Sequence, residues 1–136
     1  MGGPTAGLMA IGGTVTGAAD GGTAIDASTG NPAPSLRMNG GGVWARRIRV
    51  VAGARRIRVD AMQTQSIRAR PTMTILKNTA VGVSTDLTYT ADAGSGWVTI
   101  TSAELTITAT GALWVILRNP EPRLCDSCYF DNLFAQ

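Results

Sequence analysis

The sequence contains no histidine, one lysine and two glutamates among its 136 residues. Without histidine, neither a Ser-His nor a Cys-His nucleophile pair can be built, and the nine carboxylates show no spacing that favours a catalytic pair. We therefore expect a protein that is not an enzyme. Lysine and glutamate are among the residues that fill exposed helix positions, so their scarcity beside 17 Thr and 17 Gly predicts an all-β domain.

Long apolar runs are also missing. The longest, at 112–117 and 8–11, fall far below the roughly 20 residues that span a bilayer, so we expect no transmembrane segment. The N-terminal residues lack the positive start and the apolar centre of a secretory signal, which predicts synthesis in the cytosol without export by such a signal. The length of 136 residues corresponds to one domain.

The chain has only two cysteines, Cys125 and Cys128, in a C-x-x-C arrangement. A tetrahedral zinc site takes four ligands, and the sequence offers no histidine and no second cysteine pair. No βαβ pattern precedes the motif, which disfavours a redox role. We expect both thiols in a structural loop, either free or bridged, and we predict no cofactor.

Two regions differ in their patterning. Residues 1–42 are rich in Gly, Thr, Ala and Pro, which predicts an N-terminal arm and a first strand packed on the domain. Residues 43–136 alternate between apolar and polar with the period of a β-strand, and turn residues separate most segments. This pattern predicts a sandwich or jelly roll of about eight antiparallel strands in a single domain. The candidate strands are 45–50, 54–59, 72–77, 86–91, 97–101, 104–109, 112–119 and 128–134.

The segment ARRIRV occurs twice, at 45–50 and 54–59, which predicts two strands joined by a short turn that contains glycine. In each copy the apolar residues share one face and two arginines share the other. These arginines are Arg47, Arg49, Arg56 and Arg58. Either they bind phosphate or an acidic protein surface, or they form a solvated face that prevents pairing with other sheets. Nucleic acid is less favoured, because aromatic residues for base stacking are missing apart from Trp44.

Segment 112–119 is apolar on both faces, with Trp114 and Ile116 on one of them. Such a strand is either buried on both sides or meets another subunit or a ligand with its outer side. Trp114 is therefore a candidate sugar-stacking platform, an interface anchor or a core residue. Near the C terminus, Asp131 lies within a predicted strand and needs a partner. A hydrogen bond to a turn is favoured over a calcium ion.

Four stretches, taken in order, resemble the galactose-binding-like jelly roll of carbohydrate-binding modules. The similar features are a G-x-P-A-P-S-L opening, a V-x-x-G turn before a long strand, a W-x-T strand and a closing Y-F-D-N strand. The resemblance covers about residues 11–134, and it implies that Trp97 is a core residue and that Asp131 fixes a turn or a structural calcium. The stretches are IDASTGNPAPSLRMNG, RIRVVAGARRIRVDAMQ, GWVTITSAELTITATGALWVILRN and CYFDNLF.

Small jelly rolls of this kind are also similar to the decoration or cement proteins of tailed-phage capsids and to other virion components. That resemblance implies a non-enzymatic virion structural protein, made in the host cytoplasm, that binds the major capsid protein and its own copies as a trimer. An arginine-rich sheet face would suit an acidic capsid surface. The expected partner surface consists of Arg47, Arg49, Arg56, Arg58, Trp114 and Ile116.

The alternative hypothesis is a carbohydrate-binding module that uses Trp44 or Trp114 as a stacking platform. The two hypotheses differ in simple observables. A stand-alone sugar binder is monomeric and shows sugar-dependent quenching of tryptophan fluorescence. A cement protein is oligomeric or binds capsids, and it ignores sugars.

Overall fold

A computed structural model of the protein describes residues 14–16, 23–26, 35–63, 70–92, 96–121 and 127–136. Within these ranges the chain is built almost entirely of strands, with one short 3-10 turn, η2 (Thr79–Val81), and no α-helix. None of the described helices has the length and apolar character needed to cross a membrane. The strands are β1 (Thr14–Thr16), β2 (Thr23–Asp26), β3 (Ser35–Met38), β4 (Val43–Val50), β5 (Gly53–Arg55), β6 (Ile57–Gln63), β7 (Thr72–Ile75), β8 (Leu87–Thr90), β9 (Gly96–Thr101), β10 (Leu105–Ile107), β11 (Gly111–Arg118) and β12 (Cys128–Ala135).

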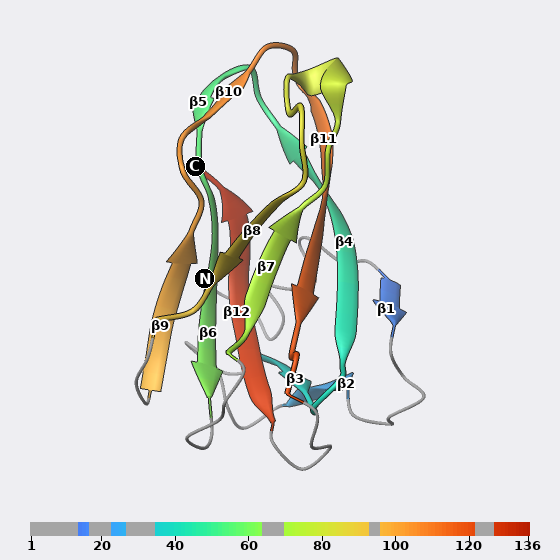
Figure 1. Ribbon diagram of the computed structural model, residues 1–136, viewed down its shortest axis with the longest axis vertical. Coiled ribbons are helices and arrows are strands. Elements are labelled where there is room, and N and C mark those ends of the chain that lie inside the picture. Colours follow the sequence, from blue (N-terminus) through green and yellow to red (C-terminus); the bar gives the residue numbers. More distant parts are fainter. Residues whose placement is uncertain (1–13, 17–22, 27–34, 64–69, 93–95, 122–126) are drawn as a thin grey trace.

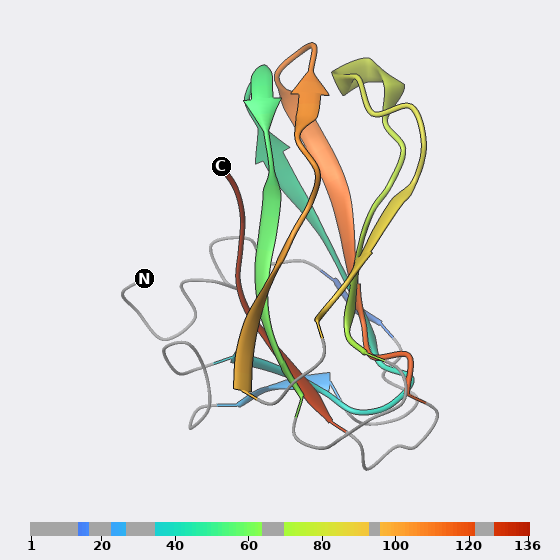
Figure 2. The ribbon, with the colours of Figure 1, turned by 60° about the vertical axis from the view of Figure 1, so that its left-hand side comes forward.

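Two five-stranded antiparallel sheets form the two layers of a β-sandwich (Figures 1 and 2). Sheet A has the order β1, β4, β11, β7, β8, and sheet B has the order β2, β3, β12, β6, β9. Strands β5 and β10 form a separate two-stranded ribbon, which lies at the same end of the molecule as η2 (Figure 1). The predicted all-β antiparallel sandwich is thereby confirmed. The twelve strands of the described ranges exceed the expected eight because three short strands precede residue 43 and because predicted segment 54–59 is divided between β5 and β6.

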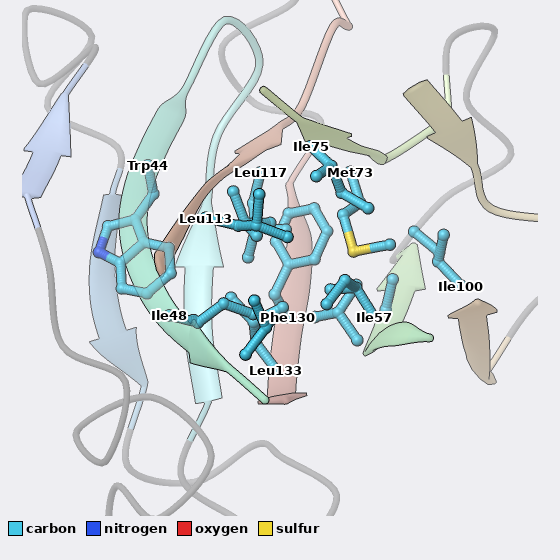
Figure 3. Packing of buried hydrophobic residues seen from close by; sticks show 14 of the residues in the cluster. Trp44, Ile48, Ile57, Met73, Ile75, Ile100, Leu113, Leu117, Phe130 and Leu133 are labelled. Carbon is cyan, nitrogen blue, oxygen red and sulfur yellow. The ribbon is translucent and has the colours of Figure 1, made fainter. Parts of the chain in front are cut away.

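The core lies between the two inner faces, as period-2 alternation requires. Leu113, Val115 and Leu117 of β11 face Val59 and Phe130 of sheet B, and all five side chains are fully buried. Figure 3 shows the packed cluster, with aromatic and aliphatic side chains interleaved between the layers. This core fixes the orientation of every strand, so the residues between the inward ones must point out of the sandwich.

Trp44 belongs to this core. Its side chain is only 3% exposed, and it lies at one end of the cluster, opposite Ile100 at the other end (Figure 3). The prediction that Trp44 serves as a sugar-stacking platform is wrong, because its alternation with Ile48 and Val50 turns the indole inward.

The two ARRIRV copies form strands as predicted, but the strands do not pair with each other. The first copy lies in β4 of sheet A, and the second runs through β5 into β6 of sheet B. The Arg55 guanidinium holds the connecting turn, donating from Nε to the Val51 carbonyl at 2.9 Å and from Nη2 to the Ala52 carbonyl at 3.0 Å. Gly53 supplies the φ of 124° that the turn requires. The chain thus crosses from one layer to the other between the two copies.

Strands that precede residue 43 join both layers. Strand β1 pairs with β4 at the edge of sheet A, and β2 pairs with β3 at the edge of sheet B. Most of the predicted N-terminal arm lies outside the described residues, as does Cys125. The division into segments 1–42 and 43–136 stays a prediction.

Candidate functional site

The outer face of sheet A carries four of the predicted site residues on two paired strands: Arg47, Arg49, Trp114 and Ile116. Antiparallel register aligns the outward side chains of β4, β11, β7 and β8 in rows across the sheet. We call this surface the Trp114 face. Its members are Val43, Ala45, Arg47, Arg49, Ala112, Trp114, Ile116, Arg118, Thr72, Thr74, Thr88 and Thr90.

Trp114 lies near the middle of this face. Its side chain is 43% exposed, and it stands directly opposite Arg47 on β4. Directly opposed residues of an antiparallel pair have Cβ atoms about 4.5–5.5 Å apart. The Trp114 carbonyl accepts the backbone N–H of Leu76 at 2.9 Å, which ties the residue to the strand on its other side. Of the three roles left open by the sequence, a core position is therefore excluded for Trp114.

Next to Trp114, the face changes from apolar to hydroxyl-rich. Ile116 is half-buried, and its row continues from Ala45 on one side to Thr74 on the other. The Thr74 and Thr88 hydroxyls share a hydrogen bond of 2.9 Å between β7 and β8. Thr74 is buried, so the face combines one exposed aromatic ring with the exposed Thr88 side chain, whose hydroxyl this bond fixes.

The charge on this face comes from arginine. Arg47 and Arg49 project from β4, Arg118 projects from the end of β11, and all three are exposed. A shallow depression at one end of the face is lined by Arg47, Arg49, Thr110, Gly111 and Ala112. The small side chain of Ala112 leaves space beside the two long arginine side chains in this depression.

The remaining predicted arginines lie elsewhere. Arg58 projects from β6 on the outer face of sheet B, where its guanidinium carbon is 5.9 Å from the Phe134 ring centroid and its Nη1 donates to Gln136 Oε1 at 2.8 Å. Arg56, just before β6, donates from Nη1 to the Ser102 carbonyl at 3.1 Å. The structure therefore splits the expected partner surface of four arginines, Trp114 and Ile116 between the two sheets.

Trp97 is not a core residue, which corrects the implication of the family resemblance. It is half-buried on the outer face of sheet B, where it stands opposite Met62, and Met62 stands opposite Tyr129. The sequence held a signal for this placement, because Trp97 alternates in phase with Thr99 and Thr101, and both of these are exposed.

Asp131 is buried on β12, and its Oδ1 accepts the backbone N–H of Asn132 at 2.8 Å. This contact is a local hydrogen bond of the kind that the sequence favoured. Among the described residues, no group of three or more acidic, cysteine or histidine side chains is arranged to hold a metal ion. Calcium binding by Asp131 stays a prediction.

Cys128, the described member of the C-x-x-C pair, is a free thiol in the core. Burial raises the pKa of this thiol well above its ordinary value, because the thiolate would lose its hydration. A protonated, inaccessible thiol is unsuited to redox exchange or metal binding, so Cys128 contributes to packing.

No protein-family model matches the sequence, and no curated protein is similar to it. Solved structures are similar in fold. A family 16 carbohydrate-binding module has 13% identity and a TM-score of 0.58, covering 90% of this chain and 97% of its own. The CBM22-1 xylan-binding domain of Xyn10C from Paenibacillus barcinonensis also has 13% identity and a TM-score of 0.58, covering 92% and 85%.

A third similar structure is the module TmCBM61 in complex with β-1,4-galactotriose, with 11% identity, a TM-score of 0.51 and coverage of 76% of this chain and 70% of its own. At such low identity the likeness concerns the fold. The chain has the β-sandwich jelly roll that is found in carbohydrate-binding modules.

Proposed function

We propose that the protein is a non-catalytic carbohydrate-binding module, and that it binds glycan across the Trp114 face. The observation that carries this proposal is the exposed indole of Trp114, held on the central part of a regular sheet beside fixed polar side chains. Together with half-buried Ile116 on the same face, this ring offers the aromatic and apolar surface that anchors ligands at binding sites.

The chemistry of the face suits a sugar. One side of a pyranose ring presents C–H groups that stack on an indole, while its hydroxyls seek hydrogen-bond partners. Exposed Arg47, directly opposite Trp114, and the exposed Thr88 hydroxyl on the same face supply such partners, whereas Thr74 is buried. Because these groups project from paired strands and not from loops, their backbone is already ordered, and a ligand has to order only the side chains.

Catalysis is not part of the proposal. Glycoside hydrolysis needs two carboxyl groups that flank the bond to be cleaved. The outward positions of β4, β11, β7 and β8, all of them within the described chain, carry no Asp or Glu. The face therefore offers groups for binding and none for acid-base chemistry.

The similar solved structures support glycan binding, since each is a carbohydrate-binding module. None of the comparisons points to a virion protein, and the capsid partner and the trimer have no support among them. Location in a virion stays a prediction that follows from the sequence resemblance alone.

The test is affinity gel electrophoresis with soluble xylan, glucomannan, β-1,4-galactan and polygalacturonate, combined with tryptophan fluorescence. We expect at least one polysaccharide to retard the wild-type chain. We expect Trp114→Ala to weaken that binding about 10-fold or more, because exposed aromatic anchors carry most of the binding energy at such sites. Phe134→Ala is the matched control, because Phe134 is equally exposed at 43% but lies on sheet B.

Binding that survives in Trp114→Ala, or that is lost equally in Phe134→Ala, would contradict the placement on sheet A. A wild-type chain that none of the four polysaccharides retards would contradict glycan binding itself. Thermal unfolding of each variant shows whether a loss of binding reflects a loss of fold.

A further inference from the structure

Three arginine side chains on the Trp114 face have no partner within the described chain. No hydrogen bond or ion pair of the described residues engages the guanidinium of Arg47, Arg49 or Arg118. Their counterparts in the second ARRIRV copy differ, since Arg56 and Arg58 both donate to oxygens of the chain itself. The same sequence motif therefore presents free guanidinium groups on sheet A and engaged ones near sheet B.

The face also lacks the anions that would neutralise these groups. Asp86 and Asp92 flank β8 at the edge of sheet A, two strands away from β11. Glu121, three residues after Arg118, is buried and has a partner of its own. Asp86 is already used, because its Oδ1 accepts the backbone N–H of Lys77 at 2.8 Å. The part of the face formed by β4 and β11 thus carries three positive charges and no negative one.

The arginines flank the indole along the strand direction. Arg49 is aligned with Ala112, Arg47 with Trp114, and Arg118 lies at the opposite end of β11. From the row of Ala112 to that of Arg118 is six residues, or about 20 Å at 3.3–3.4 Å per residue. This length accommodates an extended chain of several sugar rings, with cationic groups on both sides of the stacking platform.

From this arrangement we infer that the ligand of the Trp114 face is an acidic polysaccharide, whose ring carboxylates or sulfates are bound by Arg47, Arg49 and Arg118. The inference rests on the proposed function and adds the chemical class of the glycan. Guanidinium presents a planar fork of donors that matches a carboxylate or a sulfate in a bidentate manner. The shallow depression lined in part by Arg47, Arg49 and Ala112 would bring one such group to two guanidinium groups, one of which lies opposite Trp114.

The test compares polygalacturonate with the same backbone after methyl esterification, which removes the charge and keeps the sugar. We expect wild-type protein to bind the acidic form about 10-fold or more tightly than the ester, since a hydrogen bond to a charged group contributes more than one to a neutral group. Raising the NaCl concentration should weaken binding of the acidic form, because exposed charges are screened. Dextran sulfate in a parallel arm distinguishes sulfate from carboxylate as the anion.

The repeat provides a matched pair of variants. Arg47→Gln/Arg49→Gln and Arg56→Gln/Arg58→Gln remove the same charge from the same motif in different places. We expect the first to reduce affinity for polygalacturonate or dextran sulfate about 10-fold or more, and the second to change it less than about 2-fold. An equal loss in both would show that net charge alone is responsible, and it would overturn the inference.

Two other outcomes would also overturn it. One is equal binding of the acidic and esterified polymers. The other is tighter binding of single-stranded DNA than of any acidic polysaccharide, which would assign the arginines to nucleic acid. If xylan or galactan binds through Trp114 and the acidic polymers bind no more tightly, the proposal of glycan binding is supported and the preference for acidic glycans is contradicted.

Discussion

The side-chain amide of Asn132 donates a hydrogen bond of 3.0 Å to Asp60 Oδ2, across the irregularity where β12 leaves its regular register with β6. Asn132 has a φ of 52°, the only positive value found among the described residues other than glycine. Asparagine tolerates this left-handed conformation better than most residues. Asn132 therefore has two roles: it adopts a left-handed backbone conformation, and its side chain donates a hydrogen bond to Asp60. Substitutions can test the two roles separately.

We expect Asn132→Ala to lower the free energy of unfolding by about 2–3 kcal/mol, because alanine loses the bond to Asp60 and is strained at this φ. Asn132→Gly also loses the bond but relieves the strain, so it should cost about 1–2 kcal/mol. Urea unfolding of the two variants measures the difference. A glycine variant less stable than the alanine variant would contradict the assignment of strain.

Substitutions at two glycines with positive φ distinguish the cost of backbone strain from the cost of a steric clash. Gly82 has a φ of 98°, and a Cβ added there would lie 2.8 Å from the Thr106 carbonyl oxygen and 3.0 Å from the Thr108 side chain. Gly96 has a φ of 87°, but an added Cβ would meet nothing within 4 Å.

Gly96→Ala should therefore cost only the backbone term, about 1–2 kcal/mol. Gly82→Ala adds a collision with backbone and should cost about 1–3 kcal/mol more. Thermal unfolding of both variants gives the comparison, and equal losses of stability would argue against the tight packing of η2 on this segment.

The strands themselves could be predicted from alternation and turn residues. Predicted segment 128–134 is β12 (Cys128–Ala135), and predicted segment 97–101 is β9 (Gly96–Thr101). The sheet to which each strand belongs could not be predicted. The two ARRIRV copies have the same local pattern, and only long-range pairing with β11 or with β12 assigns them to different layers.

For the site, alternation predicted which residues share a face, but it did not show which face stays uncovered. The pattern places Trp114 and Ile116 on one face, as the structure does, whereas the exposure of Trp114 depends on what packs over sheet A. The phase of alternation is consistent with a buried Trp44 and an outward Trp97, contrary to both expectations. Trp44 is in phase with buried Ile48, but Arg46 lies between them on the same side and hides the pattern.

Because of Cys128, the free energy of unfolding should fall as the pH rises through the alkaline range. Burial raises the pKa of the folded thiol, so above about pH 8.5 the unfolded chain releases a proton that the folded chain retains. Stability that is fully present below the unfolded pKa is then lost as the pH rises, by up to about 1.4 kcal/mol per pH unit.

The measurement is the difference in urea unfolding between the wild type and Cys128→Ala, from neutral pH to about pH 10. Cys128→Ala should be less stable at neutral pH, because it leaves a small void, and its stability should decline less steeply with pH. Parallel declines in the two proteins would mean that the thiol ionises as readily in the fold as in the unfolded chain.

Trp44 and Trp114 should respond oppositely to truncation in stability and in binding. Trp44→Ala empties a site in the core that is only 3% exposed and should cost about 3–5 kcal/mol. Trp114→Ala removes a ring that is 43% exposed and should change the free energy of unfolding by less than about 1 kcal/mol. Urea unfolding measures both. If Trp114→Ala destabilises the fold as much as Trp44→Ala, the indole packs against the protein itself, and it is then not available to a ligand.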